Sequence, residues 1–260
     1  MDKISLVVTA HRKCFLYEAL ISVAAQDDKD FEFVLCIDSN GEEGLEEFCK
    51  DIFDCIECTE KRIVKVKGQG TAGYIRNEAF SNTTGNWLAY LDGDDIIAPD
   101  AIRIMREAIE KNKEVDIFSS GMARIDKKGN IVKWEESLTY YPPITIYKED
   151  PDVIGEPTYF NQFQVMRREV WESYKYDTSS NGEDIDFMLI NLLKWKFKKV
   201  SKYLYFYRDV ENSFSKELKY EKADFTTLRY QQGFYLEYFK ENYSEHVASN
   251  FVEKITNYVK

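Results

Sequence analysis

Residues 87–95 read Trp-Leu-Ala-Tyr-Leu-Asp-Gly-Asp-Asp, and this stretch decides the fold. A short apolar run that ends abruptly in polar residues is typical of a strand buried on both faces of a sheet. Three of the next four residues carry carboxylates, and like charges gathered at one strand end cost energy unless a cation neutralises them. Pro99 follows where a helix through Lys111 would begin, because proline is favoured in the first turn.

The acidic cluster has two interpretations. Carboxylate oxygens suit Mg²⁺ or Mn²⁺, and these ions commonly bind the phosphates of a substrate as well. The alternative is an acidic turn that stabilises the positive end of the following helix. The buried strand in front favours the metal site, because it delivers the cluster to a fixed place.

Strands and helices alternate on both sides of this stretch. Four alternations within 120 residues predict a mostly parallel sheet covered by helices on both faces. The expected strands are 4–8, 31–37, 62–66, 87–91 and 115–120, and the expected helices are 14–26, 41–53, 71–81 and 99–111.

Polar residues follow three of these strands where each strand ends. They are Thr9–Arg12, Asp38–Asn40 and Asp92–Asp95. Ligands of such sheets bind at the carboxyl ends of the strands, so we expect a binding site at this edge.

Beyond residue 120 the pattern changes. The segment 138–160 holds four of the five prolines and five aromatic residues, and a loop of this length is usually functional. The other expected elements are a hairpin at 122–134 that turns at 127–130, a helix at 185–195, a strand at 200–207 and helices from about 216 to the end.

Composition excludes several classes of protein. The chain has 260 residues, of which 44% are hydrophobic and 31% are charged, which is enough for a sizeable core. A net charge of −11 argues against non-specific nucleic-acid binding and against a broadly basic membrane-binding surface. No apolar run approaches a membrane span or the core of a signal peptide, so membrane contact is expected to be peripheral at most.

Five cysteines, an odd number with no secretory signal before them, predict reduced thiols. A zinc site at Cys49, Cys55 and Cys58 is the weaker alternative, because structural zinc usually takes four ligands.

A second acidic motif, Gly182-Glu183-Asp184-Ile185-Asp186, precedes the expected helix at 185–195. Its acids could simply enrich the first turn of that helix, or they could carry chemistry.

Five motifs in register resemble family 2 glycosyltransferases of the GT-A fold, over roughly residues 3–215. They are the first strand with its loop and helix (4–26), Arg76–Ala79, Trp87–Asp95, Gly182–Asp186, and Leu204–Arg208 with Asn212–Ser215. The resemblance implies an α/β, Rossmann-like catalytic domain over 1–215, with a nucleotide-binding half (1–120) and an acceptor-binding half (121–215). A helical extension over 216–260 would follow it.

The resemblance also implies roles for individual residues. Asp184 is expected to be the general base, with Glu183 as the alternative. A divalent metal, Mn²⁺ or Mg²⁺, is expected at Asp94 with Asp92 and Asp95. Nucleotide-sugar contacts are expected from Thr9, Ala10, His11, Arg12, Asp38, Arg76, Asp92 and Gly93.

The implied activity is metal-dependent, inverting transfer of one sugar from a nucleotide sugar, with UDP expected, to a saccharide acceptor. The metal would neutralise the diphosphate leaving group, and the base would take the proton of the attacking hydroxyl. Bacterial surface-polysaccharide or lipid-linked glycan synthesis is the implied context. The expected location is the cytoplasm, with peripheral contact at the inner face of the membrane as an option.

The sequence departs from the family at three places. Val210 stands where many relatives carry a histidine near the metal or diphosphate, and the turn at 68–73 is looser than usual. The Gln-x-x-Arg-Trp motif of processive relatives is missing, which favours single-sugar addition.

Two other functions stay open. A sugar-nucleotide pyrophosphorylase would need a glycine-rich, basic signature after the first strand, and Thr9–Lys13 contains no glycine. A non-catalytic nucleotide- or glycan-binding module is supported by Val210, and the two acidic motifs argue against it.

The tail 221–260 carries amphipathic patterns with five basic and six acidic residues. Packing onto the catalytic domain is the expected role, with a dimer contact or a membrane anchor as alternatives, and the near neutrality makes the membrane anchor the weakest of the three.

Overall fold

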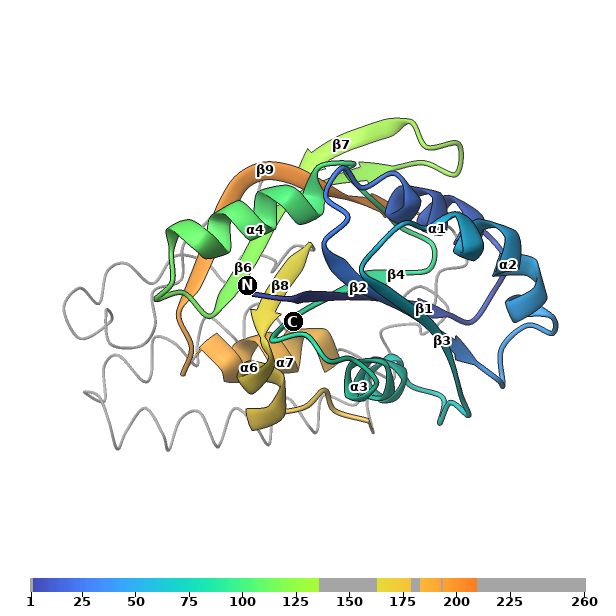
Figure 1. Cartoon of the computed structure of the whole chain (residues 1–260), viewed down its shortest axis with the longest axis horizontal. Helices are drawn as coiled ribbons and strands as arrows, with labels where there is room; N and C mark the ends of the chain where they lie inside the picture. The colour runs from blue at the N-terminus through green and yellow to red at the C-terminus, as the bar shows by residue number, and fades with distance from the viewer. Residues whose placement is uncertain (1, 136–162, 179–182, 193, 210–260) are drawn as a thin grey trace, which may run out of the picture.

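A nine-stranded sheet forms the centre of the protein, which we describe from a computed structural model (Figure 1). The structure describes residues 2–135, 163–178, 183–192 and 194–209. The expected loop at 138–160, Val210 and the expected helices from 216 onward lie outside these residues. The strand order is β3-β2-β1-β4-β8-β6-β9-β5, and β7 pairs with β6 beside this path.

The first half of the sheet is entirely parallel, as the alternation predicts. Its strands are β1 (Ile4–Ala10), β2 (Phe31–Asp38), β3 (Glu60–Val66) and β4 (Trp87–Asp92). The central strand β1 pairs with β2 and β4, so that Thr9 lies beside both Cys36 and Asp92. The carboxyl ends of these strands therefore meet at one edge.

Helices cover both faces because the strand residues alternate between two cores. Leu6 and Val8 of β1 face one core, and Val7 faces the other. The first core is closed by α1 (Leu16–Ala24), α2 (Leu45–Cys55) and α4 (Ala101–Lys111), and the second by α3 (Ala72–Ser81), α6 (Arg168–Ser173) and α7 (Glu183–Leu192). Figure 1 shows these two helical layers above and below the sheet.

The second half of the sheet is mixed. β8 (Gln164–Arg167) runs antiparallel between β4 and β6 (Ile117–Ile125), and β6 lies parallel to β9 (Phe197–Arg208). The expected hairpin is confirmed: β7 (Ile131–Glu135) returns along β6 after a turn in which the Asp126 carboxylate accepts hydrogen bonds from the Lys128 and Asn130 amides. The α/β prediction holds, whereas the short elements β5 (Ile96–Ile97), β8 and α6 were not expected.

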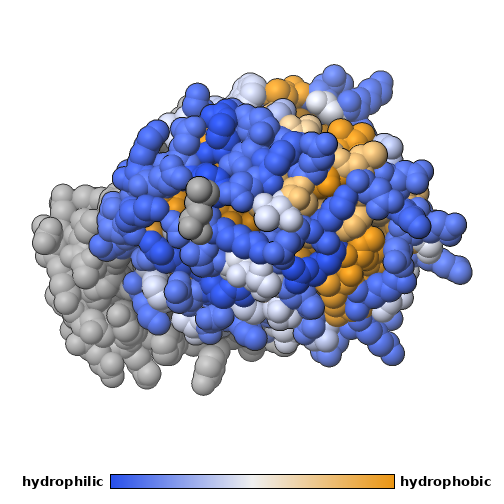
Figure 2. All heavy atoms as spheres, in the orientation of Figure 1, coloured by the Kyte–Doolittle hydropathy of each residue, from blue (hydrophilic) through white to orange (hydrophobic). Residues whose placement is uncertain are grey.

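The surface seen in Figure 2 is largely hydrophilic, with apolar patches between the charged side chains. Across the described segments, no helix is long and apolar enough to cross a membrane. The large apolar side chains that are exposed lie on α1, α2 and β7, and they are Tyr17, Ile21, Phe48, Ile131, Val132 and Trp134.

The edge of the sheet where β1 and β2 begin is held by a buried carboxylate, Glu32. It accepts hydrogen bonds from the Ser5 hydroxyl (2.5 Å), the Arg62 guanidinium (2.6 Å) and the Thr84 amide (2.7 Å). Burial raises the pKa of Glu32, but the hydrogen bonds from Ser5 and Thr84 outweigh it and hold the pKa below its ordinary value. One side chain thus joins β1, β2, β3 and the segment before β4.

We predict that Glu32→Ala lowers the free energy of unfolding by about 3–5 kcal/mol, because it leaves buried donors unsatisfied. Glu60→Ala is the matched control, since the exposed Glu60 binds the same guanidinium nitrogen of Arg62 at 3.0 Å. This control should cost about 0–1 kcal/mol. Urea denaturation of both variants measures the difference, and equal losses would contradict the assignment.

Candidate active site

The guanidinium of Arg76 lies at the centre of the carboxyl edge of the sheet. Arg76 is 6% exposed. Its Nη2 donates to both oxygens of Asp92 (3.1 and 3.2 Å), and its Nη1 donates to Oε1 of Glu183 (2.5 Å). The guanidinium also stacks 4.5 Å from the centre of the Tyr90 ring. The structure shows Arg76 as the link between the end of β4 and α7, and its expected contact with the nucleotide stays a prediction.

The charged groups of this cluster shift one another's pKa values. Burial lowers the pKa of Arg76, but the nearby charges of Asp92 and Glu183 raise it well above its ordinary value. Burial raises the pKa of Glu183 to about 7, although the charge of Arg76 opposes this shift. Asp184, the next residue of α7, is half-buried and its charge also acts on Arg76. One guanidinium therefore binds two carboxylates and lies in the electrostatic field of a third.

α3 holds the chain segment before α7 by direct contact. Gly73 leaves no room for a side chain, because a Cβ there would lie 2.0 Å from the carbonyl oxygen of Asp177. The Asn77 side chain accepts from the Trp171 indole (2.9 Å) and the Tyr176 amide (3.1 Å), and it donates to the Tyr176 carbonyl (2.8 Å). The Arg76-Asn77 pair therefore anchors both α7 and the segment that leads to it.

A second part of the site forms where β1 and β2 end. The buried Asp38 accepts hydrogen bonds from the amides of Asn40 and Gly68, both at 2.9 Å, and its other oxygen lies 3.0 Å from Nδ1 of His11. A Cβ on Gly68 would lie 2.5 Å from that carboxylate. Asp38 is thus surrounded by backbone, while the His11 side chain is 57% exposed.

The remaining residues predicted to contact the nucleotide sugar lie along the same edge. Thr9 and Ala10 belong to β1, and Arg12 is exposed in the loop that follows. Gly93 passes over the end of β1, where a Cβ would lie 2.6 Å from the Thr9 carbonyl oxygen. Asn40 belongs to the polar cluster expected at this edge, and the sequence pattern assigned no individual role to it or to Gly68; the Asn40 side chain donates to the Gly68 carbonyl (2.6 Å) and so ties the end of β2 to the turn at 68–73.

Asp95, expected as a metal ligand, is bound by β9. The Tyr205 hydroxyl donates to its Oδ2 (2.6 Å), and the Arg208 amide donates to its Oδ1 (2.7 Å). Asp95 is buried, and burial together with the charge of Asp94 raises its pKa well above the ordinary value. Both carboxylate oxygens of Asp95 accept hydrogen bonds from β9, as both oxygens of Asp92 accept from Arg76, and the expectation that Asp95 ligates a metal stays a prediction.

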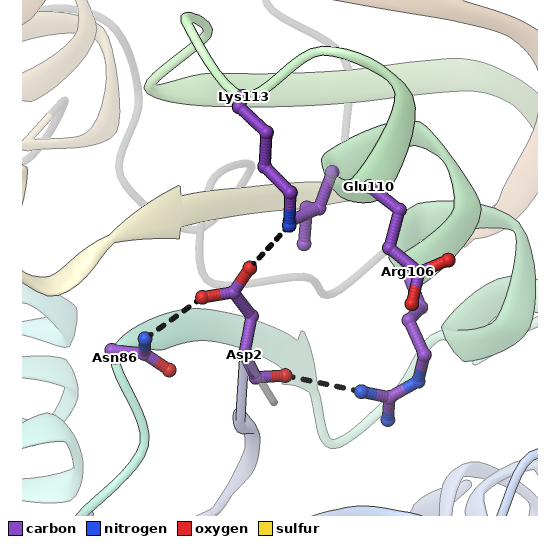
Figure 3. A pocket seen from close by; sticks show the side chains of 6 residues that line it. Asp2, Asn86, Arg106, Glu110 and Lys113 are labelled. Atoms are coloured by element: carbon purple, nitrogen blue, oxygen red, sulfur yellow. Dashed lines mark hydrogen bonds and ion pairs between the residues drawn. The ribbon is translucent and has the colours of Figure 1, made fainter.

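A pocket of about 470 Å³ opens at the opposite edge of the sheet (Figure 3). Three of its lining residues bind Asp2: the Asp2 carboxylate accepts from Lys113 (2.8 Å) and Asn86 (3.1 Å), and Arg106 donates to the Asp2 carbonyl (3.1 Å). Since none of the predicted site residues lines it, we place the functional site at the carboxyl edge.

Comparison with known proteins decides what this arrangement belongs to. Residues 5–174 match the family model described as Glycosyl transferase family 2. The chain is a member of glycosyltransferase family 2. It is therefore a glycosyltransferase, and the family resemblance of its motifs is confirmed.

Relatives of this glycosyltransferase cover most of its length. It is 26% identical to the uncharacterised glycosyltransferase MJ1057 of Methanocaldococcus jannaschii, over 88% of this chain and 80% of that protein. It is 24% identical to the GalNAc(5)-diNAcBac-PP-undecaprenol beta-1,3-glucosyltransferase of Campylobacter jejuni, over 80% of this chain and 65% of that enzyme.

Solved structures confirm the GT-A fold of the glycosyltransferase. Residues 1–349 of S. aureus TarS, crystallised in complex with UDP-GlcNAc, superpose with a TM-score of 0.75 at 17% identity. The match covers 98% of this chain and 72% of that one.

The fit of a metal to this family 2 site rests on two carboxylates. Across the described residues, no group of three or more His, Cys, Asp or Glu side chains is arranged to hold a metal ion. Burial, followed by the charge of Asp92, raises the pKa of Asp94 to about 6, so a cation beside this pair would relieve repulsion. Asp92 and Asp94 therefore fit a partial site, whereas Cys49, Cys55 and Cys58, which form no disulfide, are not grouped as metal ligands.

We predict that Asp94→Asn stabilises the glycosyltransferase without metal at neutral pH. The raised pKa means that the folded protein holds the Asp94 proton more tightly than the unfolded chain does. This contribution to stability is lost as pH rises from about 4 through 6. The variant should gain about 1 kcal/mol at pH 7.5 and nothing at pH 4, measured by chemical denaturation in EDTA. A loss of stability at both pH values would instead favour a loop-capping role.

Proposed function

We propose that this glycosyltransferase moves a single sugar from a UDP-sugar to a saccharide acceptor, with inversion and with the help of Mn²⁺ or Mg²⁺. The observation that carries the proposal is the buried Arg76, which binds Asp92 and Glu183 and feels the charge of Asp184, at the same edge of the sheet as Asp38. A nucleotide sugar needs both a pocket for its base and groups that handle its diphosphate. The complex of TarS with UDP-GlcNAc supports UDP as the nucleotide.

The donor site divides into two parts. Thr9–Arg12 and Asp38 would hold the base and ribose. Asp38 lies 3.0 Å from Nδ1 of His11, and the exposed His11 ring is proposed to stack on the base. The close passage of Gly93 over the end of β1 places the acidic loop beside Thr9, and the ribose would lie against this backbone. Asp92 and Asp94 would hold the divalent cation, which neutralises charge on the departing diphosphate.

We assign the general base to Asp184 and not to Glu183. Glu183 is buried and committed to Arg76, whereas the neighbouring Asp184 is half-buried. In the proposed step, an acceptor oxygen bonds to the anomeric carbon as the bond from that carbon to the diphosphate oxygen breaks. The hydroxyl proton passes to the Asp184 carboxylate. A single displacement of this kind inverts the anomeric carbon.

The acceptor is proposed to be a growing bacterial glycan. The Campylobacter jejuni relative is named for an acceptor linked to undecaprenol diphosphate. We propose a lipid-linked acceptor for this chain as well. Such an acceptor would require work at the cytoplasmic face of a membrane. In this division of labour, residues 1–120 bind the nucleotide and residues 121–215 the acceptor.

We predict that Asp184→Asn keeps donor affinity but lowers the transfer rate by about 10²–10⁴-fold, since an amide preserves shape but accepts no proton. A panel of nucleotide sugars with Mn²⁺ or Mg²⁺ measures both quantities, by calorimetry and by release of the nucleotide. Glu183→Gln is the matched control and should retain more transfer while losing stability.

Each outcome separates one part of the proposal. Full transfer by Asp184→Asn would remove Asp184 as the base, and selective loss in Glu183→Gln would move that role to Glu183. Failure of the wild-type protein to bind any nucleotide sugar would sink the transferase mechanism. Release of pyrophosphate from a nucleoside triphosphate and a sugar phosphate would point to a pyrophosphorylase.

A further inference from the structure

Two residues at the end of β9, Tyr205 and Arg208, form hydrogen bonds with the acidic loop 92–95. Besides its bond to Asp95, the Tyr205 hydroxyl receives a long hydrogen bond from the Asp92 amide (3.5 Å). Arg208 binds the loop at two points: its amide donates to Asp95, and its Nε donates to the Asp94 carbonyl (3.0 Å). Three of the four residues in the loop are therefore tied to one strand end.

The Arg208 guanidinium extends these ties to three other parts of the chain. Its Nη1 donates to the carbonyls of Asp126 and Lys127, both at 3.2 Å, in the turn between β6 and β7. Its Nη2 donates to the Glu18 carboxylate on α1. Its face lies 4.3 Å from the centre of the Phe15 ring, at a residue held in a left-handed conformation (φ 64°). Every guanidinium nitrogen of this buried arginine has a partner.

This arrangement does more than fill the core. The loop carries three carboxylates whose mutual repulsion would spread it apart in the absence of a cation. Side chains at Asp92 and Asp95 are fixed by Arg76 and by β9 respectively. Arg208 holds the Asp94 backbone through its carbonyl. The position of the Asp94 side chain is therefore set by the contacts that hold the rest of the loop.

We propose that Tyr205 and Arg208 are positioning residues, which hold loop 92–95 in the shape that lets Asp94 and Asp92 receive a divalent cation together with a nucleoside diphosphate. The inference rests on the proposed function in that this loop is taken as the cation site. It adds that the site is built in advance by β9, so that Asp95 serves as its anchor and not as a ligand. Preorganised ligands bind more tightly because less ordering is left to the moment of binding.

The test uses the full chain and Tyr205→Phe, which removes one hydroxyl and keeps the ring. Binding of Mn²⁺ in the presence of saturating UDP is followed by the electron paramagnetic resonance signal of free Mn²⁺. The variant should bind Mn²⁺ about tenfold more weakly, and sugar transfer should show the same shift in the Mn²⁺ concentration for half-maximal rate. At saturating Mn²⁺ the maximal rate should approach that of the wild type.

Tyr203→Phe is the matched control. Tyr203 lies on the same strand and packs edge-on against Trp134 at 4.7 Å, on β7 and away from the acidic loop. It should leave Mn²⁺ affinity unchanged. Arg208→Lys, a second variant that keeps the charge beside Glu18 but loses the forked contacts, should weaken Mn²⁺ binding in the same direction.

The failure of this inference is distinct from the failure of the proposed function. If wild-type protein binds Mn²⁺ with UDP and Tyr205→Phe binds it equally well while melting at a lower temperature, Tyr205 is structural only and the inference is overturned. If the wild type itself binds neither Mn²⁺ nor UDP, the proposed function is at fault.

Discussion

The geometry of the site depends on one buried side chain, the guanidinium of Arg76. Arg76 binds Asp92 on β4 and Glu183 on α7, and it thereby joins the second helical layer to the carboxyl edge of the sheet. Buried ion pairs are costly to form and costlier to break, because a lone charge left in the interior has no compensation. Here the pair joins residues 107 positions apart in the chain. The ion pair thus fixes where the acids of α7 lie relative to those of β4.

α3, the helix that carries Arg76, also makes the contacts that bring α7 close enough for this ion pair. Gly73 allows α3 to touch the backbone of Asp177, and Asn77 holds the segment that precedes α7. On the far side of the acidic loop, β9 does the corresponding work through Tyr205 and Arg208. The loop 92–95 is therefore held between an arginine of α3 and the end of β9. Under the proposed function, Asp92 and Asp94 of this loop take the cation, and the half-buried Asp184 takes the proton.

The sequence could predict whatever depends on local pattern. The alternation of β1 to β4 with α1 to α4 follows from apolar runs and helical spacing, and it was enough to place Asp38 and Asp92 at one edge. β5 and β8 were missed because strands of two and four residues carry no periodicity of their own. The orientation of Asp95 and the pairing of Arg76 depend on contacts with residues about 110 positions away, which no local pattern contains. Membership of the motifs in a common site was therefore predictable, whereas the division of labour among the acids was not.

The central claim is that Arg76 and Glu183 act as one unit. A double-mutant cycle tests it most directly, with unfolding free energies measured for Arg76→Met, Glu183→Gln and the combined variant. The account predicts a coupling energy of about 1–3 kcal/mol, because each single change leaves a buried partner uncompensated. Losses that add within about 0.5 kcal/mol would contradict it, since independent residues behave in that way.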